Sequence, residues 1–158
     1  MDWTLFLIFF ATAMAAGTTG AVFEPGTWYR SLIKPWWTPP GWAFPLVWTT
    51  LYVAMSVAAA RVAPLEGSMY AMGFWGLQIV LNTLWTPIFF GLRRMRFAMG
   101  VMACLWVAVA GTMLLMWPLD QTASLLFAPY LLWVTVAGLL NFTVLRLNPD
   151  EKGLRAMG

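Results

Sequence analysis

The residues of this sequence that could do chemistry are aromatic rings and amides, because the usual catalytic side chains are scarce. The chain has no histidine and a single cysteine, Cys104, among its 158 residues. This composition excludes a histidine-based triad, a histidine ligand to haem iron, an intramolecular disulfide and the usual metal-binding motifs. Tryptophan remains, with a flat ring that stacks on flat ligands and a polar N–H at its edge. We therefore expect a site for a flat apolar molecule, with no metal and no obligatory cofactor.

The aromatic residues are concentrated in residues 28–52, which contain five tryptophans, two tyrosines and four prolines. Each proline fixes φ, removes a backbone donor and disfavours a helical conformation in the residue before it. The spacing of three of them predicts an ordered, non-helical loop over 24–42: Pro35, Pro39 and Pro40. An interfacial belt of tryptophan and tyrosine is the alternative, since such belts occur at headgroup depth in many membrane proteins. A belt needs no rigid backbone, so the prolines favour a shaped loop that forms the lid or wall of a site.

The composition places the helices that must position these rings in a bilayer. Hydrophobic residues make up 61% of the chain and charged residues only 9%, far from the values of soluble domains. The charged residues separate five uncharged windows, each longer than the ~20 residues that span a hydrocarbon core. The sequence thus predicts an all-α, single-domain bundle of five transmembrane helices, at about 3–23, 43–63, 68–91, 97–117 and 122–145. No charge falls inside the uncharged windows themselves, which are 3–23, 35–60, 67–92, 97–119 and 121–145. This disfavours ion-coupled transporters, pumps and voltage sensors.

The basic residues are distributed unequally between the two sides of such a bundle. Eight lie in the loops and tail of one side, and Arg61 alone lies on the other. The positive-inside rule then predicts a cytoplasmic C-terminus and first loop, with the N-terminus across the membrane. The net charge of +3 reflects this topology, and nucleic acid is not expected as a partner.

Helix periodicity selects the side chains that face the interior. Gln78, Asn82, Trp85 and Phe89 fall at i, i+4, i+7 and i+11, so amides and large rings share one stripe. A buried amide needs a hydrogen-bond partner, which places this stripe inside the bundle. Two interpretations stay open at this point. The amides either line a pocket or only bond neighbouring helices.

The second and fifth predicted helices carry comparable faces. Trp48 and Tyr52 are one turn apart on the second, and Trp133, Ala137 and Asn141 follow one face of the fifth. The small Ala137 leaves a notch that is either a packing contact or space for a ligand. Small residues also recur every four positions on the first and fourth helices, which permits close helix contacts within or between protomers: Ala13, Gly17 and Ala21, and Gly100, Cys104, Ala108 and Thr112.

Three stretches, in the same order and spread over nearly the whole chain, resemble the TspO/MBR family of tryptophan-rich sensory proteins, whose mitochondrial members are the translocator proteins. The first runs from Trp28-Tyr29 through Lys34-Pro35 to Trp48-Thr49 and Leu51-Tyr52. The second is Leu81-Asn82-x-x-Trp85-x-Pro87-x-Phe89-Phe90-Gly91. The third is Pro129-Tyr130-Leu131-x-Trp133 and continues to Asn141, Arg146 and Asn148.

The resemblance implies a multi-pass bacterial membrane protein, commonly a homodimer, that binds tetrapyrroles such as protoporphyrin IX and haem, besides cholesterol and benzodiazepine-site drugs. Whether the inner or outer membrane houses it stays open. Together with the faces above, the family motifs give one ligand-binding set: Tyr29, Trp36, Trp48, Tyr52, Gln78, Asn82, Trp85, Phe89, Trp133, Ala137 and Asn141. Arg30 and Lys34 are available to pair with porphyrin propionates. Phe142 stands where the animal sterol motif has tyrosine, which weakens the expectation of sterol binding.

Three functions are compatible with this resemblance. The chain is a tetrapyrrole-binding sensor, a transporter of such ligands, or an enzyme that degrades porphyrin in light, with Trp48 or Trp133 as the redox partner. Binding comes first because each mechanism requires it. The sequence shows neither inverted repeats nor interrupted half-helices, which disfavours transport. A sterol- or lipid-binding or transport protein is the alternative.

Overall fold

The computed structural model describes residues 2–23 and 25–149, and all regular structure in these ranges is helical. Four stretches are long and apolar enough to cross a membrane. They are α1 (Trp3–Val22), α3 (Ala43–Val62), α5 (Met95–Met116) and the stretch Gln121–Leu147. A further long helix, α4 (Met69–Thr86), falls outside this set because its two amides, Gln78 and Asn82, lower its mean hydropathy. The prediction of an all-helical membrane bundle is confirmed, with four of its five expected spans identified by length and composition.

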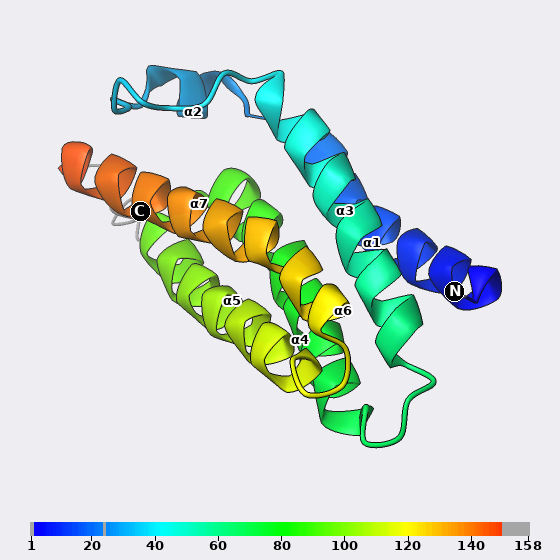
Figure 1. The fold of residues 1–158 in the computed structure, drawn as a ribbon. Helices are drawn as coiled ribbons and strands as arrows, with labels where there is room; N and C mark the ends of the chain where they lie inside the picture. Colours follow the sequence, from blue (N-terminus) through cyan, green and yellow to red (C-terminus); the bar gives the residue numbers. More distant parts are fainter. Residues whose placement is uncertain (1, 24, 150–158) are drawn as a thin grey trace.

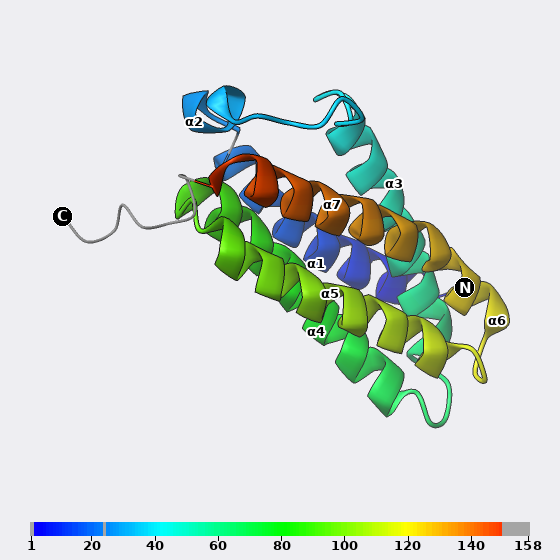
Figure 2. The ribbon, with the colours of Figure 1, turned by 90° about the vertical axis from the view of Figure 1, so that its left-hand side faces the viewer.

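The helices pack as two groups joined at one end (Figure 1). In one group α5 packs between α4 and α7 (Ala128–Leu147), and in the other α1 packs on α3. The short helix α6 (Gln121–Leu126) packs against α3 and α5 at the end we call the floor. At the opposite end, which we call the roof end, α2 (Thr27–Ser31) and the segment leading to α3 lie across the bundle in both views (Figure 2).

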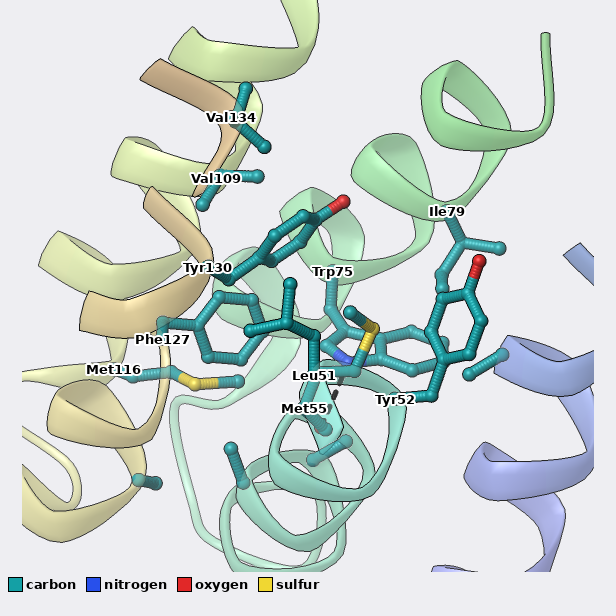
Figure 3. Close-up of a cluster of buried hydrophobic side chains, with 14 of the residues drawn as sticks. Leu51, Tyr52, Met55, Trp75, Ile79, Val109, Met116, Phe127, Tyr130 and Val134 are labelled. Carbon is teal, nitrogen blue, oxygen red and sulfur yellow. Dashed lines mark hydrogen bonds between the residues drawn. The ribbon is translucent and has the colours of Figure 1, made fainter. Parts of the chain in front are cut away.

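The floor end is filled by a continuous core of side chains from α3, α4, α5 and the α6–α7 region (Figure 3). Phe127 and Met116 are fully buried and pack in one cluster with Met55 of α3 and Trp75 of α4. The indole N–H of Trp75 donates to the backbone oxygen of Met55 at 3.2 Å, which joins α4 to α3. Three consecutive alanines of α3 are at most 1% exposed and let neighbouring helices approach closely: Ala58, Ala59 and Ala60.

Two predicted helices are interrupted, each next to a proline. The helix expected over 122–145 is divided at Phe127 into α6 and α7, because Pro129 has no N–H to continue the ladder. The helix expected over 68–91 is α-helical only to Thr86 and ends as one π-helical turn, η1 (Pro87–Gly91). Pro87 again removes a ladder donor, and a π turn is one of the arrangements that accommodate this loss.

The prediction of a non-helical loop over 24–42 is wrong for residues 27–31 and agrees with the structure for residues 32–42. Residues 27–31 form the helix α2, whereas the residues from 32 to 42, including all three loop prolines, form no helix. Two turns shape this part, with the Thr38 N–H donating to the Pro35 oxygen and the Ala43 N–H to the Pro40 oxygen. We call residues 27–42 the roof segment.

Candidate ligand-binding cavity

A cavity of about 890 Å³ lies beneath the roof segment and between the two helix groups. Its walls come from α1, α3, α4, η1, α5 and α7, and its volume is typical of sites that enclose a whole small molecule. Most residues of the predicted set contribute to its lining: Tyr29, Arg30, Lys34, Trp48, Tyr52, Asn82, Trp85, Phe89, Trp133, Ala137 and Asn141. Residues distant in sequence are thus brought together, and those on the long helices lie on the faces that their spacing indicated.

Aromatic rings form opposite walls of this cavity. On the α4–η1 wall, Trp85 and Phe89 are stacked, with ring centroids 5.0 Å apart and an angle of 19° between the planes. Across the cavity, Trp48 of α3 lies against the Tyr52 ring at 5.5 Å. Trp133 of α7 meets Phe44 of α3 edge to face at 5.5 Å. Rings in these arrangements leave flat faces to which an aromatic ligand can stack.

A polar network closes the cavity toward the floor. The Asn82 side-chain amide donates to the Tyr130 hydroxyl at 2.9 Å, and that hydroxyl donates to Gln78 Oε1 at 2.9 Å. Gln78 is fully buried and does not line the cavity, so the structure places it behind the wall, as a brace between α4 and α7. Its assignment to the ligand-facing set is therefore corrected, because one helical stripe runs through both the cavity and the packed core. Asn82 lies at the boundary and does line the cavity.

Other polar groups at the cavity have no partner in the part of the chain that the structure describes. Four buried side-chain atoms lack a hydrogen bond among the described residues: Trp85 Nε1, Trp133 Nε1, Asn141 Nδ2 and Asn141 Oδ1. All three residues line the cavity, and Trp85 and Trp133 also pack against the edge of the floor core. Leaving a buried polar group unpaired costs about 1–3 kcal/mol, so such groups normally find a partner or a role. A ligand with polar atoms at its edge can supply these partners after small side-chain rotations.

The two basic residues at the roof have different surroundings. The Lys34 ammonium donates to three backbone oxygens, those of Tyr29 at 2.8 Å, Leu32 at 2.8 Å and Arg30 at 3.2 Å. Its three donors are thereby used to cap α2, so the structure gives Lys34 a structural role in addition to its place in the lining. The Arg30 guanidinium makes no hydrogen bond or ion pair within the described residues. Burial raises the pKa of the Tyr29 phenol, so this roof hydroxyl stays protonated and neutral at physiological pH.

Trp36 is placed away from the site. It is 96% exposed and is not part of the lining, so its assignment to the ligand-facing set is also corrected. It lies in the turn that follows Pro35, and there the ring points outward. The density of tryptophans in the roof segment does not specify which rings face inward.

Sequence reasoning also missed part of the lining. Phe44 precedes Trp48 by one helical turn, so the i, i+4 rule could have identified it. Gly17, Gly20 and other α1 residues form a further wall, although the small-residue stripe of this helix suggested only packing. At Gly17 a Cβ atom would lie 2.6 Å from the Tyr52 ring, so glycine is what permits this ring to approach α1.

Comparison with known proteins agrees with the motifs that line this cavity. The chain is 53% identical to the tryptophan-rich sensory protein of Cereibacter sphaeroides, over 99% of each chain. It is also 53% identical to protein CrtK of Rhodobacter capsulatus, over 96% of this chain and 98% of the relative. The human translocator protein is 35% identical over 82% of this chain and 80% of its own length. The TspO/MBR family model matches residues 7–147, which include every residue that lines the cavity, and the chain therefore belongs to the TspO/MBR family.

Proposed function

We propose that this protein binds tetrapyrroles, such as protoporphyrin IX and haem, in the aromatic cavity beneath the roof segment. The observation that carries the proposal is the combination of a cavity of about 890 Å³, aromatic rings on opposite walls and a cationic rim. The rings would stack on the macrocycle, and Arg30 would pair with a propionate. Since Lys34 is engaged by three carbonyls, Arg30 carries most of the charge pairing in this proposal.

A fluorescence titration tests this function. Purified protein in detergent is titrated with protoporphyrin IX in darkness, and quenching of tryptophan emission is followed. We expect saturable quenching, with weaker binding after Arg30→Gln and unchanged binding after Arg61→Gln at the floor end. Quenching that rises linearly with porphyrin and is identical in the variants would overturn the proposal.

Illumination of the same samples separates a photochemical role from binding alone. In the photochemical case, bound porphyrin loses its absorbance in light, and Trp48→Phe or Trp133→Phe slows the loss while binding is retained. These tryptophans line the cavity, so either is placed to donate an electron to an excited ligand. Loss at equal rates in the wild type and both variants would assign the protein to sensing or transport.

A sterol- or lipid-binding role is the second candidate, supported by a groove between α5 and α7. This groove has a volume of about 370 Å³ and an almost entirely apolar lining that includes Trp106, Leu139 and Phe142. The Arg146 guanidinium lies 5.3 Å from the centroid of the Phe142 ring and could meet a sterol hydroxyl nearby. Cholesterol that binds here should not displace porphyrin, whereas competition between the two would place both in the cavity.

The membrane arrangement is part of the proposal. With α4 and η1 together as a fifth span, the residues Arg30, Lys34, Arg93 and Arg146 all lie at the roof end and Arg61 at the floor end, so we place the roof end in the cytoplasm.

We also propose a homodimer. Gly100 and Cys104 are exposed on α5, whereas Ala108 and Thr112 of the same stripe are buried within the protomer. Gly100→Leu with Cys104→Leu should therefore dissociate a dimer formed through α5, as measured by light scattering.

A further inference from the structure

One side chain at the end of α7 holds the roof segment by paired hydrogen bonds. The Ile33 backbone N–H donates to Asn148 Oδ1 at 3.0 Å, and Asn148 Nδ2 donates to the Ile33 oxygen at 2.9 Å. The two residues are 115 positions apart in the chain, yet the amide pairs with the roof backbone as a neighbouring strand would. Asn148 Nδ2 also donates to the Val144 oxygen at 2.8 Å, which fixes the side chain on its own helix.

The roof segment is an internally braced unit that rests on the bundle. Lys34 caps α2 from within the segment, as described above. Leu32 is 5% exposed and packs in one cluster with Leu140 and Val144 of α7. By contrast, Ile33 is 62% exposed, so its paired bonds to Asn148 lie at the boundary with water. Bonds in this position exchange with water at modest cost, whereas the internal brace stays intact. The roof is also held by the Tyr29 ring, which packs edge to face on Phe89 and Phe90, so the Asn148 pair is the part of the contact that water replaces most readily.

Asn148 lies on the same face of α7 as the cavity wall. Trp133, Ala137, Asn141 and Asn148 follow each other at whole helical turns, and the first three line the cavity. The helix that forms the wall thus also holds the roof at its C-terminal end, where α2 and α7 lie close together in both views (Figures 1 and 2).

We propose that Asn148 is a positioning residue that latches the roof segment over the cavity, and that release of its pair with Ile33 opens the route by which a ligand enters and leaves. This inference rests on the proposed function, because it assigns the route to the same cavity. In this proposal the Asn148 side-chain amide, which supplies both a donor and an acceptor, determines how fast a ligand enters and leaves the cavity. The aromatic walls remain the determinant of affinity.

Stopped-flow kinetics on the full chain in nanodiscs test the latch, with protoporphyrin IX as the probe. Asn148→Ala removes both bonds and should raise the association and dissociation rate constants together, each by at least about fivefold. The ratio of the two, Kd, should change by less than about twofold because the walls are intact. Asn148→Asp keeps the acceptor for the Ile33 N–H and loses the donor, so its rates should be intermediate. Thr143→Ala is the matched control, since within residues 2–23 and 25–149 the Thr143 hydroxyl bonds only to the Leu139 oxygen of its own helix.

A second measurement needs no ligand and separates this inference from the proposed function. Hydrogen exchange of peptides covering 28–34 should be faster in Asn148→Ala than in the wild type and unchanged in Thr143→Ala. If exchange is faster but no variant or wild type binds porphyrin, the latch holds and the proposed ligand is wrong. If exchange and both rate constants equal those of the wild type, the latch is refuted, and entry from the lipid phase takes its place. Rate constants that stay unchanged while the melting temperature falls would show a purely structural role and would also refute it.

Discussion

The two ends of the bundle differ in whether their buried polar groups are hydrogen-bonded and in how tightly their side chains are packed. At the floor, Ser124 donates to the Met113 oxygen and Trp75 to the Met55 oxygen, and the side chains around them pack in one buried core. At the roof end, the helices surround a cavity of about 890 Å³, where two indole N–H groups and the Asn141 amide have no hydrogen-bond partner among the residues described. We therefore expect substitutions at the floor to affect mainly stability, and substitutions around the cavity to affect mainly the ligand binding proposed above. Variants at matched positions in the two ends test this division.

The largest expected effect is on stability, from Phe127→Ala at the floor. Phe127 is fully buried between α3, α5 and α7, so its truncation leaves a cavity and should cost about 3–5 kcal/mol. Thermal melts in detergent should show a large fall for this variant and almost none for Phe97→Ala, because Phe97 is 62% exposed. The melting shift on adding porphyrin should persist in both. A lost shift in Phe127→Ala would show that the two ends are not separate in function.

A smaller effect, confined to binding, is expected from Trp133→Ala. Stacking on one ring contributes about 1–3 kcal/mol, so porphyrin affinity should fall roughly five- to hundredfold by fluorescence titration. Trp133→Phe should retain most of the affinity. Trp36→Ala is the matched control, because that ring is 96% exposed and outside the cavity. Equal losses at Trp36 and Trp133 would contradict the assignment of the walls.

Ala137→Leu and Ala59→Leu add the same side-chain volume at the cavity and at the floor, respectively. Ala137 is partly exposed and lines the cavity, so leucine there should leave the ligand-free melt nearly unchanged and abolish the porphyrin-induced shift. Ala59→Leu places the same side chain in the packed floor, where overpacking should cost about 1–3 kcal/mol and leave the shift intact. The opposite pattern, with Ala137→Leu unstable and still responsive, would make the notch a packing contact.

The smallest effect concerns pH at the floor, where Asp120 caps α6 and pairs with Arg61 at 2.8 Å. Partial burial alone would raise the pKa of the Asp120 carboxyl, but hydrogen bonds from Arg61 and the Ala123 N–H outweigh it and lower this pKa. A carboxyl group whose pKa is lowered in the folded state stabilises the protein at pH values above its unfolded-state pKa. This stabilisation is lost as the pH falls through the folded-state pKa. Acidification below about pH 4 should therefore remove at most about 1 kcal/mol from the wild type. Asp120→Asn should lack this component in melts across the same pH range, and an identical pH dependence in both proteins would exclude the carboxylate as its origin.

The sequence predicted which helix faces meet, because helical periodicity is a local property. Trp48, Asn82, Trp85 and Trp133 were assigned to one interior from spacing and family motifs, and they line one cavity. Helical periodicity does not show whether an inward-facing residue lines the cavity or lies in the packed core, because this depends on where the neighbouring helices converge. Gln78 therefore fell behind the wall, although it shares the stripe of Asn82.

The roof segment was predicted less well for a related physical reason. The prolines of the loop predict a backbone that is not helical. They do not predict which neighbouring rings face the cavity and which face outward, as the exposed Trp36 shows. Charge likewise does not reveal whether an ammonium is free, and three carbonyls of its own segment occupy Lys34. The Asn148 pair joins residues 115 positions apart, and periodicity gives no information at that separation.

The π-helical turn η1 makes the length of this stretch as important as its composition. Each bond of such a turn spans one residue more than an α-helical bond, and Phe89 and Phe90 lie within the widened turn and line the cavity. Deleting Pro87 or Ile88 would let the turn revert to α geometry and shift both rings by one residue position, about 100° around the helix axis. The stretch should therefore tolerate exchange of one aromatic residue for another far better than any deletion, and its residue count is itself a selectable property of the site.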